Sequence, residues 1–104
     1  MLQETTWKDG DICSIKLING DEIVAKISNH DASSITLKRP LVLSMGVDQE
    51  TQQPQLQMLP TLVVSARQDA KFTISRQHII AIGLSEDAAK AAYESNIANL
   101  TSKR

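Results

Sequence analysis

Apolar and polar residues alternate with a period of two along most of the chain, the pattern of half-buried β-strands. The first two runs have apolar faces formed by Cys13, Ile15 and Leu17 and by Ile23, Ala25 and Ile27. Asn19 and Gly20 separate these runs and tolerate positive φ, so they predict a tight hairpin turn. The second run carries Val24 on its opposite face, with Glu22 and Lys26, and is expected to end in a turn at residues 28–31.

A third run covers residues 34–43 and contains an interruption. Ile35 and Leu37 share one face, and the same phase continues to Leu41 and Leu43. Arg39-Pro40 breaks the run, and proline cannot donate to a central hydrogen-bond ladder. We therefore expect a bulge, a bend or a sheet edge at this point.

The remaining strand signals are shorter. Residues 46–55 are polar and Gln-rich, and they predict an exposed loop. A run over residues 56–66 follows, broken at Pro60, and its in-phase positions are Leu56, Met58, Leu62 and Val64. Beyond it we expect a short extended segment, a tight turn and a compact apolar strand, at residues 71–74, 75–77 and 79–82.

The last segment has helical spacing. Ser85 is expected to be the N-cap, with Glu86 and Asp87 in the first turn, where they complement the helix dipole. An apolar stripe follows, formed by Ala89, Tyr93, Ile97 and Leu100. We predict a helix over about residues 85–101 that packs on its own domain, because an isolated helix of this length is marginal in water.

Together these elements predict an all-β domain with one helix. Five strands in so short a chain cannot form two full sheets, but they can bend into a small, strongly twisted barrel of the SH3-like or OB-fold kind. We expect one domain over residues 1–104, with the barrel at about residues 11–83. The polar first ten residues are expected to form a loop or short leader.

Composition narrows the class of protein. Lys and Arg total 11 against 12 Asp and Glu, which disfavours a strongly basic domain that grips duplex nucleic acid through phosphates alone. Cys13 is the only cysteine, so no disulfide forms within the chain and it is expected to be a small buried hydrophobe. The first residues lack the apolar core of a signal peptide, and no run reaches the length of a membrane span. We expect a cytoplasmic protein.

No catalytic or cofactor motif stands out. A Gly-rich phosphate loop before a helix is missing, and Cys13 forms no nucleophile signature with His30 or His78. The same three residues have no metal-ligand spacing. We therefore expect neither an enzyme nor a cofactor or metal site. Lys26, Lys38 and Arg39 lie in neighbouring strands, where they form either a phosphate-contacting face or the solvated face of a half-buried sheet.

Two segments resemble the signatures of the Sm/LSm family. Residues 17–31 are similar to the first signature, which has a hydrophobic strand, a glycine turn at Gly20, a second strand and a loop aspartate at Asp31. Residues 74–82 are similar to the second, an isoleucine and an Arg-Gly turn followed by a short apolar strand. Here Ser75 and Arg76 align with the Arg-Gly pair, so the arginine comes one position later and the glycine is absent. Residues 46–55 correspond to the variable loop between them. The chain is most similar to divergent Sm-like proteins of the kind found in bacteriophage genomes.

The resemblance covers about residues 11–83 and implies a five-stranded, strongly bent barrel. Protomers of the family join edge to edge, which implies a homo-oligomeric ring of about five to seven copies. It also implies binding of single-stranded RNA along the ring pore or face, and a role in RNA metabolism. The family carries an N-terminal helix, whose place the C-terminal helix is expected to take here.

The resemblance puts the candidate RNA contacts in two turns, at His30, Asp31, Ser33 and Ser34 and at Ser75 and Arg76. Ser33 and Ser34 align with a base-stacking side chain and an asparagine of the family, and serine cannot stack on a base. A ring-shaped structural or protein-interaction scaffold without RNA binding is therefore the alternative function. The alternative for Asp31 is an Asx-turn with its own backbone, and for His30 a solvated position. For Arg76 it is an exposed position in a turn, or an ion pair with an aspartate across a subunit interface.

Overall fold

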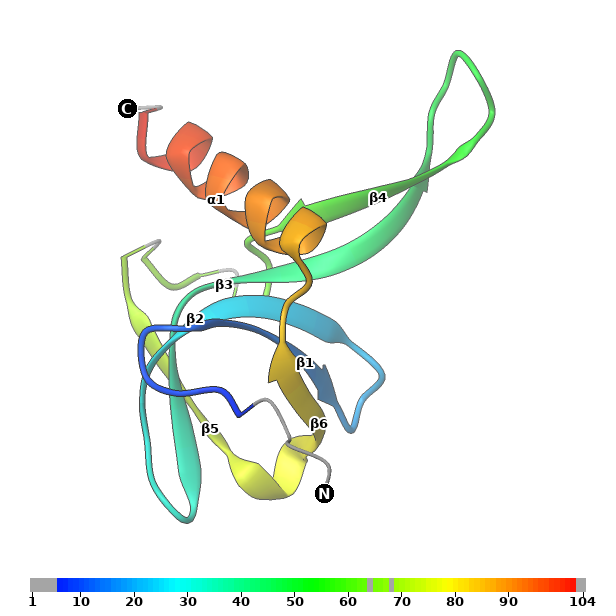
Figure 1. Cartoon of the computed structure of the whole chain (residues 1–104). Coiled ribbons are helices and arrows are strands. Elements are labelled where there is room, and N and C mark those ends of the chain that lie inside the picture. Colours follow the sequence, from blue (N-terminus) through cyan, green and yellow to red (C-terminus); the bar gives the residue numbers. More distant parts are fainter. Residues whose placement is uncertain (1–5, 64, 68, 103–104) are drawn as a thin grey trace.

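The alternating runs fold into one antiparallel sheet that is followed by a helix (Figure 1). The computed structural model describes residues 6–63, 65–67 and 69–102. Its elements are β1 (Ile12–Leu17), β2 (Glu22–His30), β3 (Ser34–Val47), β4 (Pro54–Leu59), β5 (Lys71–Ser75), the 3₁₀ turn η1 (Arg76–His78), β6 (Ile79–Leu84) and α1 (Asp87–Ser102). The strand order is β4-β3-β2-β1-β6, and β5 also pairs with β3. Within these residues β4 and β6 do not pair, so the sheet does not close.

The β1–β2 hairpin confirms the first predicted turn. Lys16 pairs with Glu22, and the loop between the strands contains Asn19 and Gly20. Of these two loop residues only Gly20 has a positive φ, of 98°. The turn is therefore of the longer kind that needs glycine at one position, and Asn19 does not adopt the positive φ that it tolerates.

Strand β2 runs further than its sequence pattern predicts. The expected turn at residues 28–31 is wrong, because Asn29 and His30 still pair with Thr36 and Ile35 of β3. The turn is confined to residues 31–33. The polar end of β2 thus holds His30 at the base of a short, well-defined turn.

A bulge at Arg39-Pro40 divides β3 into two halves. Val24 pairs with Leu41 and Lys26 with Lys38, so two residues of β3 stand opposite one residue of β2. Arg39 has a positive φ of 51°. The predicted bulge is confirmed, but the expected common phase of the flanking leucines is wrong, because the extra residue turns the second half of β3 over.

The sheet has six strands among the described residues and not the predicted five, because the short extended segment expected at residues 71–74 is a strand of its own, β5, and the run expected at residues 56–66 is a strand only as far as Leu59. Strand β4 pairs with residues 42–47 of β3 and β5 with residues 34–38, on the same edge of β3. The chain leaves this edge after Leu59, next to Pro60, and returns at Lys71. Val64, expected to be in phase, lies outside the described residues.

The predicted polar loop at residues 46–55 is shorter than expected. Gly46 pairs with Gln55 and Val47 with Pro54, so only residues 48–53 connect the strands. The β3–β4 hairpin projects from the body as a long arm (Figure 1).

Two apolar clusters lie on opposite faces of the sheet. The first is formed by the predicted inward faces, with Cys13, Ile15, Leu17, Ile23, Ala25, Ile27, Ile35 and Leu37 buried. The second lies under α1 and contains Ile12, Val24, Leu41 and Tyr93. The face of β2 that carries Val24 is therefore covered by the helix. Burial raises the pKa of the Cys13 thiol to about 11, which makes it the inert core residue that was expected.

Helix α1 is joined to the bulge through one side chain. The Tyr93 ring is buried in the second cluster, and its hydroxyl lies 3.1 Å from the carbonyl oxygen of Lys38 and 2.9 Å from that of Arg39. Burial raises the pKa of Tyr93 to about 12. Ile97 packs against the same cluster, whereas the side chain of Leu100, the last residue of the predicted stripe, lies outside the described residues.

Ser85 does not act as the expected N-cap. It lies two residues before the helix, where its hydroxyl is 2.8 Å from that of Ser14 and its N–H donates to the Ile12 carbonyl at 3.1 Å. The helix begins at Asp87, whose carboxylate lies in the first turn as predicted. Ser85 therefore attaches the linker to β1 instead of starting the helix.

Replacing Tyr93 with phenylalanine is expected to lower the free energy of unfolding by about 1–2 kcal/mol, because the bulge carbonyls lose a donor while the ring stays in place. Urea denaturation followed by circular dichroism measures this change. Ser95→Ala is the matched control, since it removes an exposed hydroxyl from the same helix. Equal denaturation midpoints for the parent chain and Tyr93→Phe would contradict the role given to this hydroxyl.

Candidate functional site

The turn between β2 and β3 is organised by one carboxylate. Oδ1 of Asp31 accepts hydrogen bonds from the backbone N–H groups of Ser33 at 2.9 Å and Ser34 at 2.8 Å. The hydroxyls of the same two serines donate to it at 3.2 and 3.3 Å. The backbone bonds hold the pKa of Asp31 below its usual value. The carboxylate thus has the Asx-turn role, and it also engages both serine hydroxyls.

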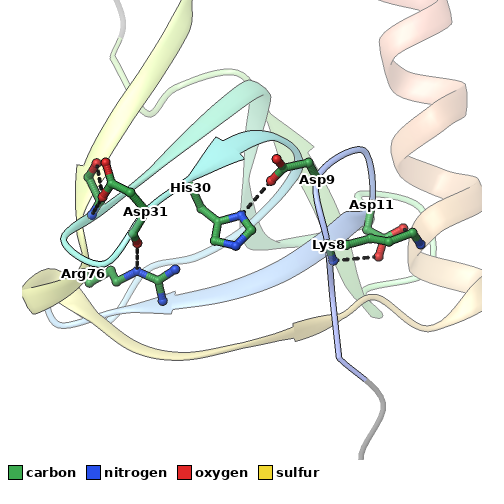
Figure 2. Close-up of polar contacts among 7 residues, drawn as sticks. Lys8, Asp9, Asp11, His30, Asp31 and Arg76 are labelled. Carbon is green, nitrogen blue, oxygen red and sulfur yellow. Dashed lines mark hydrogen bonds and ion pairs between the residues drawn. The ribbon is translucent and has the colours of Figure 1, made fainter.

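Arg76 joins this turn to the turn after β5 (Figure 2). Its Nε donates to the backbone carbonyl of Asp31 at 2.6 Å, and its backbone N–H donates to the carbonyl of Ser33 at 2.9 Å. Ser34 and Ser75 pair directly across β3 and β5, next to the two turns: Ser34 begins β3 and Ser75 ends β5. Among the described residues, the two terminal guanidinium nitrogens make no hydrogen bond. They are available to an anion.

The segment before β1 adds an aromatic ring and a second carboxylate. Nδ1 of His30 lies 2.6 Å from Oδ1 of Asp9 (Figure 2). The Trp7 ring meets the His30 ring edge-on, with 4.7 Å between ring centroids. The Arg76 guanidinium carbon lies 5.7 Å from the Trp7 ring centroid, within the range of a cation–π contact. We call Trp7, His30, Asp31 and Arg76 the Arg76 site.

Backbone hydrogen bonds hold this leader segment on the sheet. The N–H of Gly10 donates to the Ile27 carbonyl at 2.8 Å, and the N–H of Ile27 donates to the Asp11 carbonyl at 2.9 Å. The described part of the expected loop or leader, residues 6–10, is therefore docked against β2 through Gly10 and the adjoining Asp11. This docking brings Trp7 and Asp9, which the sequence did not single out, next to His30.

The structure brings all six sequence-predicted site residues together but leaves few of them free. The hydroxyls of Ser33 and Ser34 donate to Asp31, and Oγ of Ser75 accepts from the backbone N–H of Gln77 at 3.3 Å. The groups available to a ligand are the end of the Arg76 side chain and the exposed parts of the Trp7 and His30 rings. A cation beside two aromatic rings can hold a phosphate and stack on a nucleobase.

Comparison of the chain with models of known protein families and with curated proteins gave no match. Among the described residues, no group of three or more His, Cys, Asp or Glu side chains is arranged to hold a metal ion. In that same part of the chain, no helix has the length and apolar character needed to cross a bilayer.

Replacing Asp31 with alanine is expected to reduce the loss of stability on acidification. The pKa of Asp31 is lower in the folded chain than in the unfolded chain, so its contribution is present above about pH 4 and is lost as the pH falls through the folded value. Urea denaturation midpoints at pH 6 and pH 3 measure the difference. A variant that loses as much stability as the parent between these pH values would contradict this role of Asp31.

Proposed function

We propose that the chain is an Sm-like protein that assembles into a homo-oligomeric ring and binds single-stranded RNA. The observation that carries the proposal is a hydrogen bond of the Arg76 side chain. Arg76 lies in the turn between β5 and β6, and its side chain donates to a backbone carbonyl of the turn between β2 and β3. These two turns are the segments in which the sequence resembles the two Sm/LSm signatures. A single arginine thus joins both signature turns and keeps its two terminal guanidinium nitrogens free of hydrogen bonds to the described residues.

The chemistry of the Arg76 site suits a single-stranded nucleic acid. The terminal nitrogens of Arg76 form a planar fork that matches a phosphate group. The rings of Trp7 and His30 are the flat surfaces that Ser33 cannot supply, and base–aromatic stacking contributes about 1–3 kcal/mol per base. Asp31 serves by holding its turn rigid, so that His30 and Arg76 keep a fixed separation. A ring repeats this site around an axis, which concentrates positive charge despite a net charge of −1.

The free ends of the sheet support the ring. Strands β4 and β6 end the strand order, and each leaves a row of backbone donors and acceptors unpaired among the described residues. Large apolar side chains are exposed on both strands, at Leu56 and Leu59 of β4 and at Ile80 and Leu84 of β6. Antiparallel pairing of β4 with β6 of the next copy satisfies both rows, and we propose that each copy then forms the bent, SH3-like barrel of the family.

A ring that serves as a structural or protein-interaction scaffold is the second candidate. The observation in its favour is that Asp31 already holds the hydroxyls of Ser33 and Ser34, the two positions that align with base contacts in the family. The two functions share the assembly and differ in whether the Arg76 site binds RNA.

Arg76→Ala is expected to weaken binding of a fluorescent oligouridine about 10- to 100-fold, because it removes a charge-assisted contact of about 1.5–3 kcal/mol. Fluorescence anisotropy at low and moderate salt measures the affinity, and the slope of its salt dependence should fall. Arg67→Ala is the matched control, since Arg67 is exposed and paired with Asp69 on the segment between β4 and β5.

Circular dichroism verifies that both arginine variants stay folded. RNA binding by Arg76→Ala at the affinity of the parent chain would overturn the proposed site. A parent chain that assembles but binds no oligouridine at low salt would favour the scaffold.

Ile80→Lys is expected to dissociate the ring, because it puts a charge on the exposed side of β6, where Ile80 is 63% exposed. Native mass spectrometry should give the parent at about five to seven times the 11.4 kDa chain mass, and the variant as the monomer. Val63→Lys is the control, because Val63 is also exposed but lies outside both end strands. A monomeric parent chain, or an Ile80→Lys variant that stays assembled, would contradict the proposed interface.

A further inference from the structure

Three lysines stand directly opposite one another on neighbouring strands. Lys26 of β2 pairs with Lys38 of β3, and Lys38 pairs with Lys71 of β5. Residues that are directly opposite across antiparallel strands project from the same face of the sheet. All three side chains are exposed. We call this set the lysine row; the strands that carry it lie side by side in Figure 1.

Nothing within the described residues neutralises the lysine row. The ion pairs there are Lys8–Asp11, His30–Asp9 and Arg67–Asp69, and none involves the row. Glu94 of α1 lines a depression of about 330 Å³ together with Lys26, Lys38 and Arg39, but it forms no ion pair with them. Like charges directly opposite on a sheet are destabilising. The row therefore lowers the stability of the free protein by charge repulsion, and a bound polyanion would remove this repulsion.

A polar strip runs from the lysine row to the two turns that Arg76 joins. It lies on the face of the sheet opposite to the one from which His30 projects, because His30 pairs with Ile35 of the first cluster. Along β3 and β5 the cross-strand pairs on this face are Ser34 with Ser75, Thr36 with Thr73, and Lys38 with Lys71. The hydroxyls of the middle pair lie 3.0 Å apart. The first pair adjoins the two turns that Arg76 joins. The two ends of the strip are four positions apart along β3, a distance of about 13 Å.

We propose that the lysine row binds the phosphodiester backbone of the RNA strand that occupies the Arg76 site, an inference that rests on the proposed function. Ammonium groups on flexible stems contact phosphates as point charges and read no sequence. Three charges on adjacent strands, about 4.8 Å apart, suit a repeating line of phosphates. The row thus extends the binding surface from the Arg76 site, around the turns that Arg76 joins, onto the opposite face of β5, β3 and β2.

The test compares two doubly substituted chains. Lys38→Gln with Lys71→Gln removes two charges from the row, and Lys16→Gln with Lys90→Gln removes two charges from β1 and α1. Anisotropy titrations use oligouridines of 4 and 12 nucleotides over 50–200 mM salt. For the 12-mer, the row variant should bind more weakly, and its salt slope should fall by at least about 1.4, which is 0.7 for each lost phosphate contact. The control variant should behave like the parent chain.

Binding of the 4-mer distinguishes the contribution of the lysine row from that of the Arg76 site. The 4-mer is expected to bind the row variant within about twofold of the parent, whereas Arg76→Ala should weaken both oligonucleotides. An unchanged 12-mer slope in the row variant, or an equal fall in the control, would overturn the role of the row and leave the Arg76 site in place. Full 4-mer and 12-mer binding by Arg76→Ala would overturn the proposed function instead.

A stability measurement without RNA tests whether the like charges of the lysine row destabilise the free protein. Lys38→Gln alone should raise the thermal midpoint of the free protein, because Lys38 faces a like charge on each side. A lowered midpoint would show that the row is part of what stabilises the fold, and it would contradict the inference.

Discussion

The fold depends on the bulge at Arg39-Pro40, where one extra residue in β3 reverses which side chains face each apolar cluster. Before the bulge, Ile35 and Leu37 fill the first cluster; after it, Leu41 faces the second cluster, beneath α1. A positive φ at arginine costs of the order of 1 kcal/mol or more. Tyr93 offsets that cost by donating its hydroxyl to the bulge carbonyls, so the same side chain that anchors the helix also holds the bend.

Both proposed functional surfaces are positioned by the half of β3 before the bulge. This half pairs with β5, which aligns Ser34 with Ser75 and Lys38 with Lys71. The pairing brings the two turns together at one end, where Arg76 bonds Asp31, and sets the lysines side by side at the other. The half beyond the bulge pairs with β4 and forms the projecting arm that carries one free edge of the sheet. The first half of β3 therefore positions the proposed binding residues, and the second half positions β4, one of the two strands assigned to assembly.

The sequence correctly predicted those features of the fold that depend on the local pattern of apolar and polar residues. The inward face of β1, the glycine of the first hairpin and the bulge at Pro40 were all visible, because each depends on neighbouring residues. The change of face at Leu41, after the bulge, could not be predicted, because it follows from the register of β3 against β2. Trp7 was missed as a site residue because a polar leader has no periodicity that places it; backbone bonds to Ile27 bring it to His30. The lysine row was likewise not predictable as a whole, because its alignment follows from the registers of β3 against β2 and against β5. Of its residues, Lys26 and Lys38 stood out in the sequence.

The most direct test of the account is the fluorescence of Trp7, because it is the only tryptophan and lies in the Arg76 site. The parent chain would be titrated with oligouridine at low salt while the tryptophan emission is recorded. Binding of RNA at this site predicts a saturable change in emission with the same midpoint as the anisotropy of the labelled RNA. Anisotropy that rises to saturation while the emission stays constant would place the RNA elsewhere and contradict the account.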